Sequence, residues 1–130
     1  MDGDKLRTRR VGQAVATHPQ TGEKTWFNHA TFFHVSTLVP AIREALLMQF
    51  KEEELPNNTY YGDGSPIEPE VLDRLREIYD AETVKFPWQR GDVMLMDNLL
   101  ASHGRSPFKG DRKIIAGMAR PMTAEQLEYA

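Results

Sequence analysis

The sequence predicts a β-rich α+β fold, in which several short strands accompany two helices. The first observation behind this is a series of short apolar or aromatic segments, bounded by turn residues, near both ends of the chain. The second is a pair of longer segments, each opened by a proline, in which apolar residues recur at helical spacing. The third is the length of 130 residues, which suits one domain with one hydrophobic core.

A hairpin is expected near the start of the chain. Residues 6–17 mix basic and apolar side chains and predict an extended segment or strand. His18-Pro19-Gln20-Thr21-Gly22 is a turn, because proline and glycine both interrupt regular structure. Thr25-Trp26-Phe27-Asn28 then supplies a returning strand, and a short aromatic-rich stretch follows at residues 32–35.

Two helices occupy the middle of the predicted fold. Pro40 suits a first helical position, and apolar residues follow it at helical spacing up to Phe50. Polar residues 52–58 end this helix, and a loop with two tyrosines, Tyr60 and Tyr61, comes next. The second helix covers residues 69–81. Its apolar face is formed by Val71, Leu72, Leu75 and Ile78.

Three more strands are expected in the last third of the chain. Residues 82–88 are strand-like, and residues 89–92 form a tight turn. Residues 93–96 predict a buried strand, because all four are apolar. Residues 112–119 predict the last strand.

Composition excludes several classes of function. The chain has no cysteine, so disulfides, thiolate catalysis and cysteine-based zinc sites are excluded, and a cytoplasmic location is expected. The net charge of -3 argues against nucleic acid as a partner. No apolar run approaches the ~20 residues that span a bilayer, so no membrane association is expected. The N-terminal residues lack the apolar stretch of a signal peptide.

Residues 91–115 contain the side chains in which we expect metal binding and carboxylate binding. A turn leads into the apolar strand, which ends in Asp97-Asn98; His103 follows, and Arg112 opens the next strand. A neutral imidazole is a good ligand for Fe(II). A guanidinium that faces the same site grips a carboxylate with two parallel hydrogen bonds.

The chain resembles the TauD/TfdA-like (taurine dioxygenase-like) family of Fe(II)/2-oxoglutarate-dependent oxygenases, from about Leu6 to Pro121. Residues 91–118 resemble the C-terminal part of that family, above all in the string Asp-Asn…His-Gly-Arg-x-Pro-Phe…Arg-Lys. Further motifs occur upstream in the family's order: Thr25-Trp26-Phe27-Asn28, Phe33-His34-Val35-Ser36, Tyr60-Tyr61-Gly62-Asp63-Gly64 and Phe86-Pro87-Trp88-Gln89-Arg90-Gly91-Asp92. The likeness is greatest to members from bacterial secondary-metabolite pathways.

The resemblance implies a fold and a set of site residues. The fold would be a partial double-stranded β-helix, of the jelly-roll or cupin type, with the two helices inserted. His103 resembles the distal histidine of the 2-His-1-carboxylate iron site. Arg112 resembles the arginine that binds the distal carboxylate of 2-oxoglutarate, although strand register could turn Lys113 inward instead. Arg105 either lines the site or braces its loop, and Asn28 is a candidate for the substrate pocket.

The activity implied is hydroxylation of an unactivated C–H bond, coupled to decarboxylation of 2-oxoglutarate to succinate. The substrate expected is a small or carrier-bound molecule that resembles an amino acid. Replacement of Arg112 by Ala would separate this reading from a metal-binding cupin of another chemistry, since only the former needs 2-oxoglutarate.

The sequence departs from the family at the first half of the iron site, His-x-Asp or His-x-Glu. None of the four histidines has a carboxylate two positions later. Residues 1–130 therefore correspond to the C-terminal part of the oxygenase domain. A fragment or split gene, a misplaced start codon and a degenerate protein are the competing explanations. A second chain could supply the missing ligands; otherwise the chain is an inactive remnant or a partial barrel that binds a partner.

Simpler roles are expected for the other polar side chains. His18 and His29 are expected at the surface, and His34 is expected to be a hydrogen-bonded core or pocket residue. Asp97 could replace the missing carboxylate, but a turn-capping role beside Asn98 is favoured because such side chains bond to their own backbone.

Overall fold

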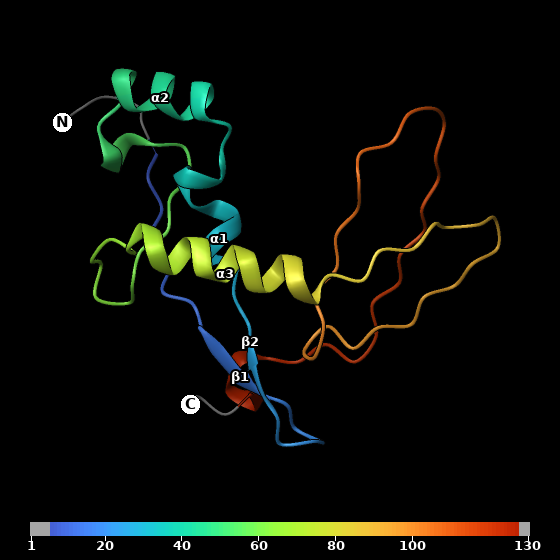
Figure 1. Ribbon diagram of the computed structural model, residues 1–130. Coiled ribbons are helices and arrows are strands. Elements are labelled where there is room, and N and C mark those ends of the chain that lie inside the picture. Colours follow the sequence, from blue (N-terminus) through green and yellow to red (C-terminus); the bar gives the residue numbers. More distant parts are fainter. Residues whose placement is uncertain (1–5, 128–130) are drawn as a thin grey trace. The chain divides into compact units, whose positions relative to one another are not determined.

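The computed structural model describes residues 6–127, which fall into two compact units (Figure 1). The described part of the first unit comprises residues 6–12 and 29–90. The described part of the second comprises residues 13–28 and 91–127. The helices of the middle of the chain therefore belong to the first unit. The N-terminal hairpin and the segment around His103 belong to the second.

The second unit contains the predicted hairpin. Strands β1 (Val15–Thr17) and β2 (Lys24–Trp26) pair antiparallel, with Val15 opposite Trp26. The turn between them closes through a hydrogen bond of 2.8 Å from Gly22 N to His18 O. Gly22 has φ 72°, a conformation that glycine adopts without steric cost. The hairpin is confirmed, with strands shorter than expected.

The first unit contains the two predicted helices, α2 (Pro40–Gln49) and α3 (Pro69–Glu82). Both begin with proline, whose fixed φ suits the first turn, where a missing N–H costs no hydrogen bond. The aromatic stretch before α2 forms a short helix, α1 (Ala30–Phe33). Two 3-10 helices complete the unit, η1 (Val35–Thr37) and η2 (Glu52–Glu54).

Helix α3 is held to the rest of its unit by one buried leucine and one arginine. Leu72 is 1% exposed and, with Ile67, forms the buried core of the unit's described residues. Arg76 donates to Ser36 Oγ at 2.5 Å and to Thr37 Oγ1 at 3.2 Å, which joins α3 to η1. Of the predicted apolar face, Val71 is 39% exposed and Ile78 is 45% exposed.

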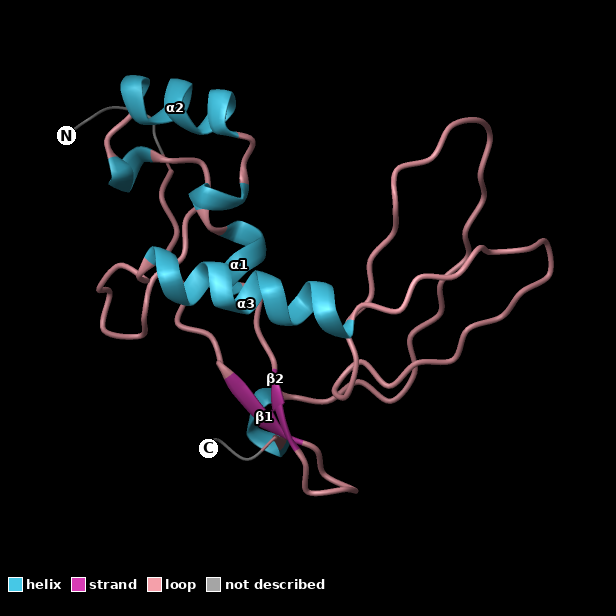
Figure 2. Cartoon of the chain, viewed as in Figure 1, coloured by secondary structure: helices cyan, strands magenta, loops and turns pink. Residues whose placement is uncertain are grey.

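The three strands predicted after α3 are not formed. Residues 83–123 contain neither helix nor strand and run as long loops (Figure 2). Val93 and Leu95, expected in a buried strand, are 93% and 98% exposed. A strand exists only where its backbone N–H and C=O groups pair with a neighbour. The described chain provides no such neighbour here, so the apolar side chains have no core to face.

The α+β class is confirmed, because the described residues contain three α-helices and one two-stranded antiparallel sheet. They are not β-rich, and a double-stranded β-helix is not seen among them. A further 3-10 helix, η3 (Ala124–Gln126), precedes Leu127, which is buried in the second unit together with Ala16. Among the described residues, no helix has the length and apolarity needed to cross a membrane.

Candidate functional site

His103 lies in the long loop of the second unit, and its side chain is exposed. Within residues 6–127, no three or more His, Asp or Glu side chains gather where they could hold a metal ion. The His103 imidazole therefore belongs to no cluster of potential metal ligands among the described residues. Its predicted role as an iron ligand stays a prediction.

Arg105 and Arg112 meet at one aromatic ring. The guanidinium carbon of Arg112 lies 4.9 Å from the centre of the Phe108 ring, and that of Arg105 lies 5.7 Å from it. A guanidinium at such a distance is attracted by the ring's electron-rich face. Two positive charges are thus held at the same phenyl group, and both side chains are exposed and open to an anionic ligand.

Asn28 closes the base of the hairpin. Its Nδ2 donates a 2.8 Å hydrogen bond to Ala14 O, beside the backbone bond of 3.0 Å from Phe27 N to the same oxygen. These bonds extend the pairing of the two strands beyond the first residue of β1, Val15, and the last residue of β2, Trp26. A role of Asn28 in a substrate pocket remains a prediction, and the amide has a structural function in the hairpin.

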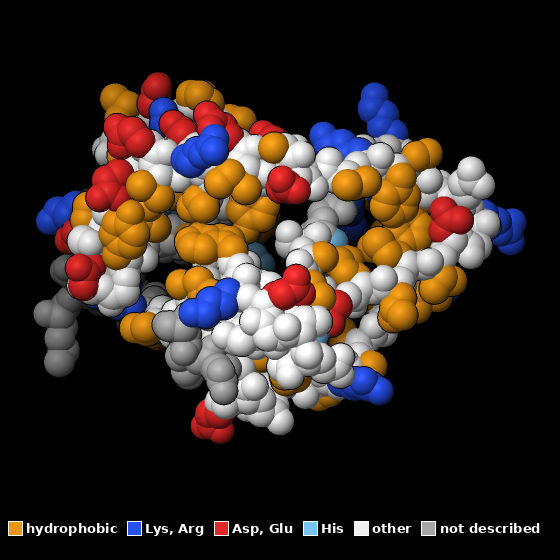
Figure 3. All heavy atoms as spheres, turned by 60° about the horizontal axis from the view of Figure 1, so that its bottom comes forward, with side chains coloured by type: hydrophobic (Ala, Val, Ile, Leu, Met, Phe, Trp, Pro, Cys, Tyr) orange, Lys and Arg blue, Asp and Glu red, His pale blue; other side chains and the backbone are white. Residues whose placement is uncertain are grey.

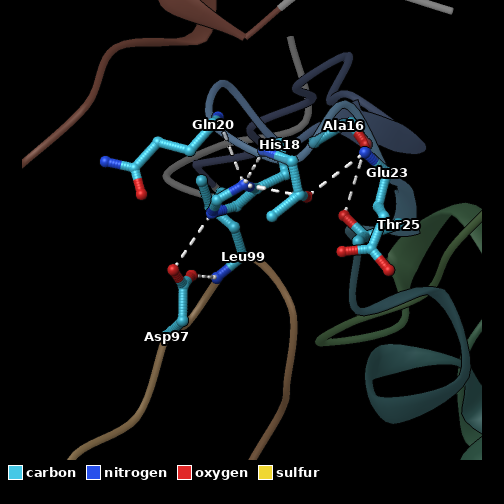
Figure 4. A network of polar contacts seen from close by, with 8 residues as sticks. Ala16, His18, Gln20, Glu23, Thr25, Asp97 and Leu99 are labelled. Atoms are coloured by element: carbon cyan, nitrogen blue, oxygen red, sulfur yellow. Dashed lines mark hydrogen bonds and ion pairs between the residues drawn. The ribbon is translucent and has the colours of Figure 1, made fainter.

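Asp97 caps a turn, as the sequence predicted. Its Oδ1 accepts a 2.9 Å hydrogen bond from Leu99 N, while its carbonyl accepts from Leu100 N at 3.2 Å and Ala101 N at 3.0 Å. The side chain thus replaces a backbone acceptor at the start of the turn, as aspartate commonly does. The other carboxylate oxygen is directed at His18 (Figure 4).

His18 is buried, so its expected surface position is wrong. Only 4% of the residue is exposed. Its Nε2 lies 3.0 Å from Asp97 Oδ2, and its Nδ1 accepts from Thr21 N at 3.1 Å and Gln20 N at 3.3 Å (Figure 4). Burial is possible because both ring nitrogens have partners, which offsets the cost of removing them from water.

Hydrogen bonds lower the pKa of Asp97. The largest cause is the bond from Leu99 N, followed by the bond from His18, since both stabilise the ionised carboxylate.

His34, in the first unit, has a lowered pKa because burial disfavours its charged form, and Arg76 adds repulsion. Its Nδ1 accepts from Ser36 N at 3.1 Å, so the expected hydrogen-bonded role is confirmed.

Sequence reasoning missed two of these residues. Phe108 belongs to the family string but no role is predicted for it, although it lies three positions after Arg105 and four before Arg112, which allows one ring to meet both. His18 was assigned to the surface because it borders a turn. A histidine that opens a turn can accept backbone N–H groups two and three residues later, as aspartate does, and that was the available signal.

Comparison with known proteins decides the family. The profile described as "Taurine catabolism dioxygenase TauD, TfdA family" matches residues 1–119. The chain belongs to the TauD/TfdA family. Its relatives point to oxygenase-type enzymes in general, and the family implies a cupin-like fold.

Two curated relatives illustrate the membership of this TauD/TfdA chain. It is 38% identical over 127 residues to the dapdiamide synthesis protein DdaC of Enterobacter agglomerans. This match covers 96% of the chain and 39% of DdaC. It is 38% identical over 60 residues to the clavaminate synthase-like protein At3g21360 of Arabidopsis thaliana. This match covers 46% of the chain and 18% of that protein. The chain thus spans about two-fifths of DdaC. No solved structure matches the chain.

The described residues of this TauD/TfdA chain do not by themselves fit the family's iron. A facial triad needs two histidines and a carboxylate on one face of the metal. His103 offers one imidazole, and no second ligand gathers with it in the described chain. His18 and Asp97 are bonded to each other and to backbone groups, so they are committed to the turn.

Proposed function

We propose that this chain is the C-terminal portion of an Fe(II)/2-oxoglutarate-dependent dioxygenase of the hydroxylase type. The observation that carries the proposal is the string from Asp97 to Lys113 within the family match, with Arg105 and Arg112 held at Phe108. In this proposal His103 supplies one iron ligand. Arg112 binds the distal carboxylate of 2-oxoglutarate, which a guanidinium grips with two parallel hydrogen bonds.

The net reaction consumes one O2 and one 2-oxoglutarate and converts a substrate C–H bond to C–OH, with release of succinate and CO2. We propose a substrate that resembles an amino acid, free or bound to a carrier. The name of the relative DdaC, a dapdiamide synthesis protein, supports a setting in bacterial secondary metabolism. Asn28 is proposed to border the substrate pocket, from the end of the hairpin.

We propose that the two remaining iron ligands lie outside residues 1–130, where a second polypeptide could supply them. No histidine of the chain is followed by a carboxylate two positions later. The apolar side chains after α3 support such a partner, because hydrophobic surface stays open to solvent (Figure 3). Val93, Leu95, Ile115 and Met118 are all more than four-fifths exposed. Burial of each would contribute about 1.5–3 kcal/mol, which would favour a strand-forming partner.

The test is an anaerobic titration of the purified chain with Fe(II) and 2-oxoglutarate, read by the metal-to-ligand charge-transfer absorption of the ternary complex. The proposal expects no band from the chain alone and a band when the missing half is supplied by a DdaC fragment that lacks the region matched here. His103→Gln should abolish the band, whereas His29→Gln, which alters another exposed histidine, should leave it. A band that survives His103→Gln would overturn the assignment of His103.

The absence of a second ligand beside His103 in the described residues favours one rival, an inactive remnant or partial barrel that binds a partner without catalysis. The same mixture distinguishes it. The oxygenase forms succinate from 2-oxoglutarate in air, whereas the rival binds the fragment in a pull-down and forms none. Failure of both binding and turnover would contradict the proposed partner as well.

A further inference from the structure

His18 links two parts of the second unit that are far apart in the sequence. Its ring lies in the turn between β1 and β2, and its bond to Asp97 spans 79 positions of the chain. Asp97 in turn begins the turn over residues 97–101. One buried imidazole therefore connects the hairpin to the segment that leads to His103 (Figure 4).

The hydrogen bonds assign the proton of the His18 ring. Nδ1 is approached by two backbone N–H groups, those of Gln20 and Thr21, and these donors need a lone pair on that nitrogen. The ring proton therefore belongs on Nε2, from which it is donated to Asp97 Oδ2 at 3.0 Å. The imidazole accepts on one side and donates on the other, so its orientation is determined by both neighbours.

Asp97 passes this orientation to the turn that follows it. Oδ2 accepts from His18, while Oδ1 accepts from Leu99 N, so both oxygens are used. The carbonyl of the same residue accepts from Leu100 and Ala101. Only Ser102 separates Ala101 from His103, and two residues reach roughly 7 Å at most. The place of the turn thus limits where the His103 imidazole can lie.

We propose that His18 and Asp97 are a positioning pair that holds the 97–101 turn against the β1–β2 hairpin and so sets the position of His103. The importance of His103 rests on the proposed function, but the coupling itself does not require iron. Neither residue is a catalytic residue, because neither is proposed to touch substrate, cofactor or metal.

The test uses two substitutions that separate the two sides of the ring. In His18→Asn, the amide oxygen takes the place of Nδ1, so it keeps the acceptor for Gln20 and Thr21 but cannot reach Asp97. In His18→Gln, the amide nitrogen takes the place of Nε2 and still reaches Asp97. His29→Asn is the matched control, since it makes the same replacement at an exposed histidine of the first unit.

Amide hydrogen exchange and histidine ring NMR signals of the full chain provide the readouts, without metal. In His18→Asn we expect exchange at Leu99, Leu100 and Ala101 to accelerate about tenfold, in line with loss of one hydrogen bond to a charged group. Gln20 and Thr21 should keep their exchange rates. The ring signals of His103 should shift in His18→Asn and return toward the wild-type position in His18→Gln.

Unchanged exchange at residues 99–101 together with unchanged His103 signals in His18→Asn would overturn the proposal. If His18→Asn does not fold, Asp97→Asn is judged by the same two signals, since it keeps a side-chain oxygen for Leu99 and removes the charge facing His18. A negative iron titration of the chain mixed with the DdaC fragment would count against the proposed function and leave the coupling intact. If His18→Asn changes neither signal while the chain still forms the charge-transfer complex with the fragment, the coupling is overturned and the proposed function stands.

Discussion

The guanidinium of Arg112 lies against the ring of Phe108, 4.9 Å from its centre, and Arg105 approaches the same ring. Both arginines are exposed, and their contact with this ring restrains the orientation of their long side chains. A contact between an arginine and an aromatic ring contributes about 0.5–1 kcal/mol at exposed sites. In the proposed function, this contact would orient Arg112 toward the carboxylate of 2-oxoglutarate.

A substitution of Phe108 tests this relationship. Phe108→Leu should weaken 2-oxoglutarate binding by about two- to fivefold, because the loss of 0.5–1 kcal/mol corresponds to that change in Kd. Phe108→Tyr should bind as the wild type does, since it keeps the aromatic face. The Kd is measured by titration of the arginine side-chain NMR signals. Equal weakening in both variants would mean that the ring acts through packing alone.

The choice between Arg112 and Lys113 as the carboxylate anchor is testable by paired substitutions. Arg112→Ala should weaken 2-oxoglutarate binding by roughly one to two orders of magnitude, as expected for loss of hydrogen bonds to a charged group. Arg112→Lys should recover only part of this, because an ammonium lacks the planar fork. Lys113→Ala should have little effect. A larger loss in Lys113→Ala than in Arg112→Ala would reverse the assignment.

The helices and the hairpin were predictable because their signals are local. Pro40 and Pro69 mark first turns, and Gly22 permits the positive φ of a tight turn. The strands at residues 93–96 and 112–119 were not predictable in the same way. Their apolar pattern reports a preference for burial, whereas strand pairing needs neighbours that the described chain does not provide.

The family could be predicted from the residues of the candidate site, whereas the geometry of these residues could not. The string around His103 and Arg112 indicates the family, which the profile match confirms. The local turn pattern could indicate that His18 accepts from Gln20 and Thr21, but its bond to Asp97, 79 positions away, could not be predicted locally. The joint contact of Arg105 and Arg112 with Phe108 likewise depends on the path of a loop.

The stability of the second unit should depend on the charge of Asp97. Its pKa is lowered in the folded chain, first by the bond from Leu99 N and then by His18. Ionised Asp97 therefore stabilises the fold above its unfolded pKa of about 3.9, and this contribution is lost as the pH falls through the lower folded value. Amide exchange at Leu100 should differ between wild type and Asp97→Asn at neutral pH. A difference that persists unchanged below the folded pKa would contradict this.

The stability of the first unit should depend on Leu72. Because this side chain is almost fully buried on α3, Leu72→Ala should lower the free energy of unfolding by about 2–5 kcal/mol. Val71→Ala, on the neighbouring and more exposed position, should cost much less. Chemical denaturation followed by circular dichroism measures both. Equal effects at the two positions would argue that α3 does not pack as described.

The pKa of His34 should report on the bond between α3 and η1. Burial lowers this pKa most, the positive charge of Arg76 lowers it further, and Glu52 opposes both. Arg76 is held close by its hydrogen bond to Ser36, whose hydroxyl also lies 2.7 Å from His34 Nδ1.

Arg76→Gln should therefore raise the pKa of His34 toward the usual value of about 6.5. Because the folded value lies below the unfolded one, the first unit should lose stability as the pH falls below about 6.5, and less so in Arg76→Gln. A histidine NMR titration provides the measurement, with Arg74→Gln as the control, since Arg74 pairs with Glu77 on the exposed side of the same helix. An unchanged His34 pKa in Arg76→Gln would show that Arg76 does not act on the imidazole.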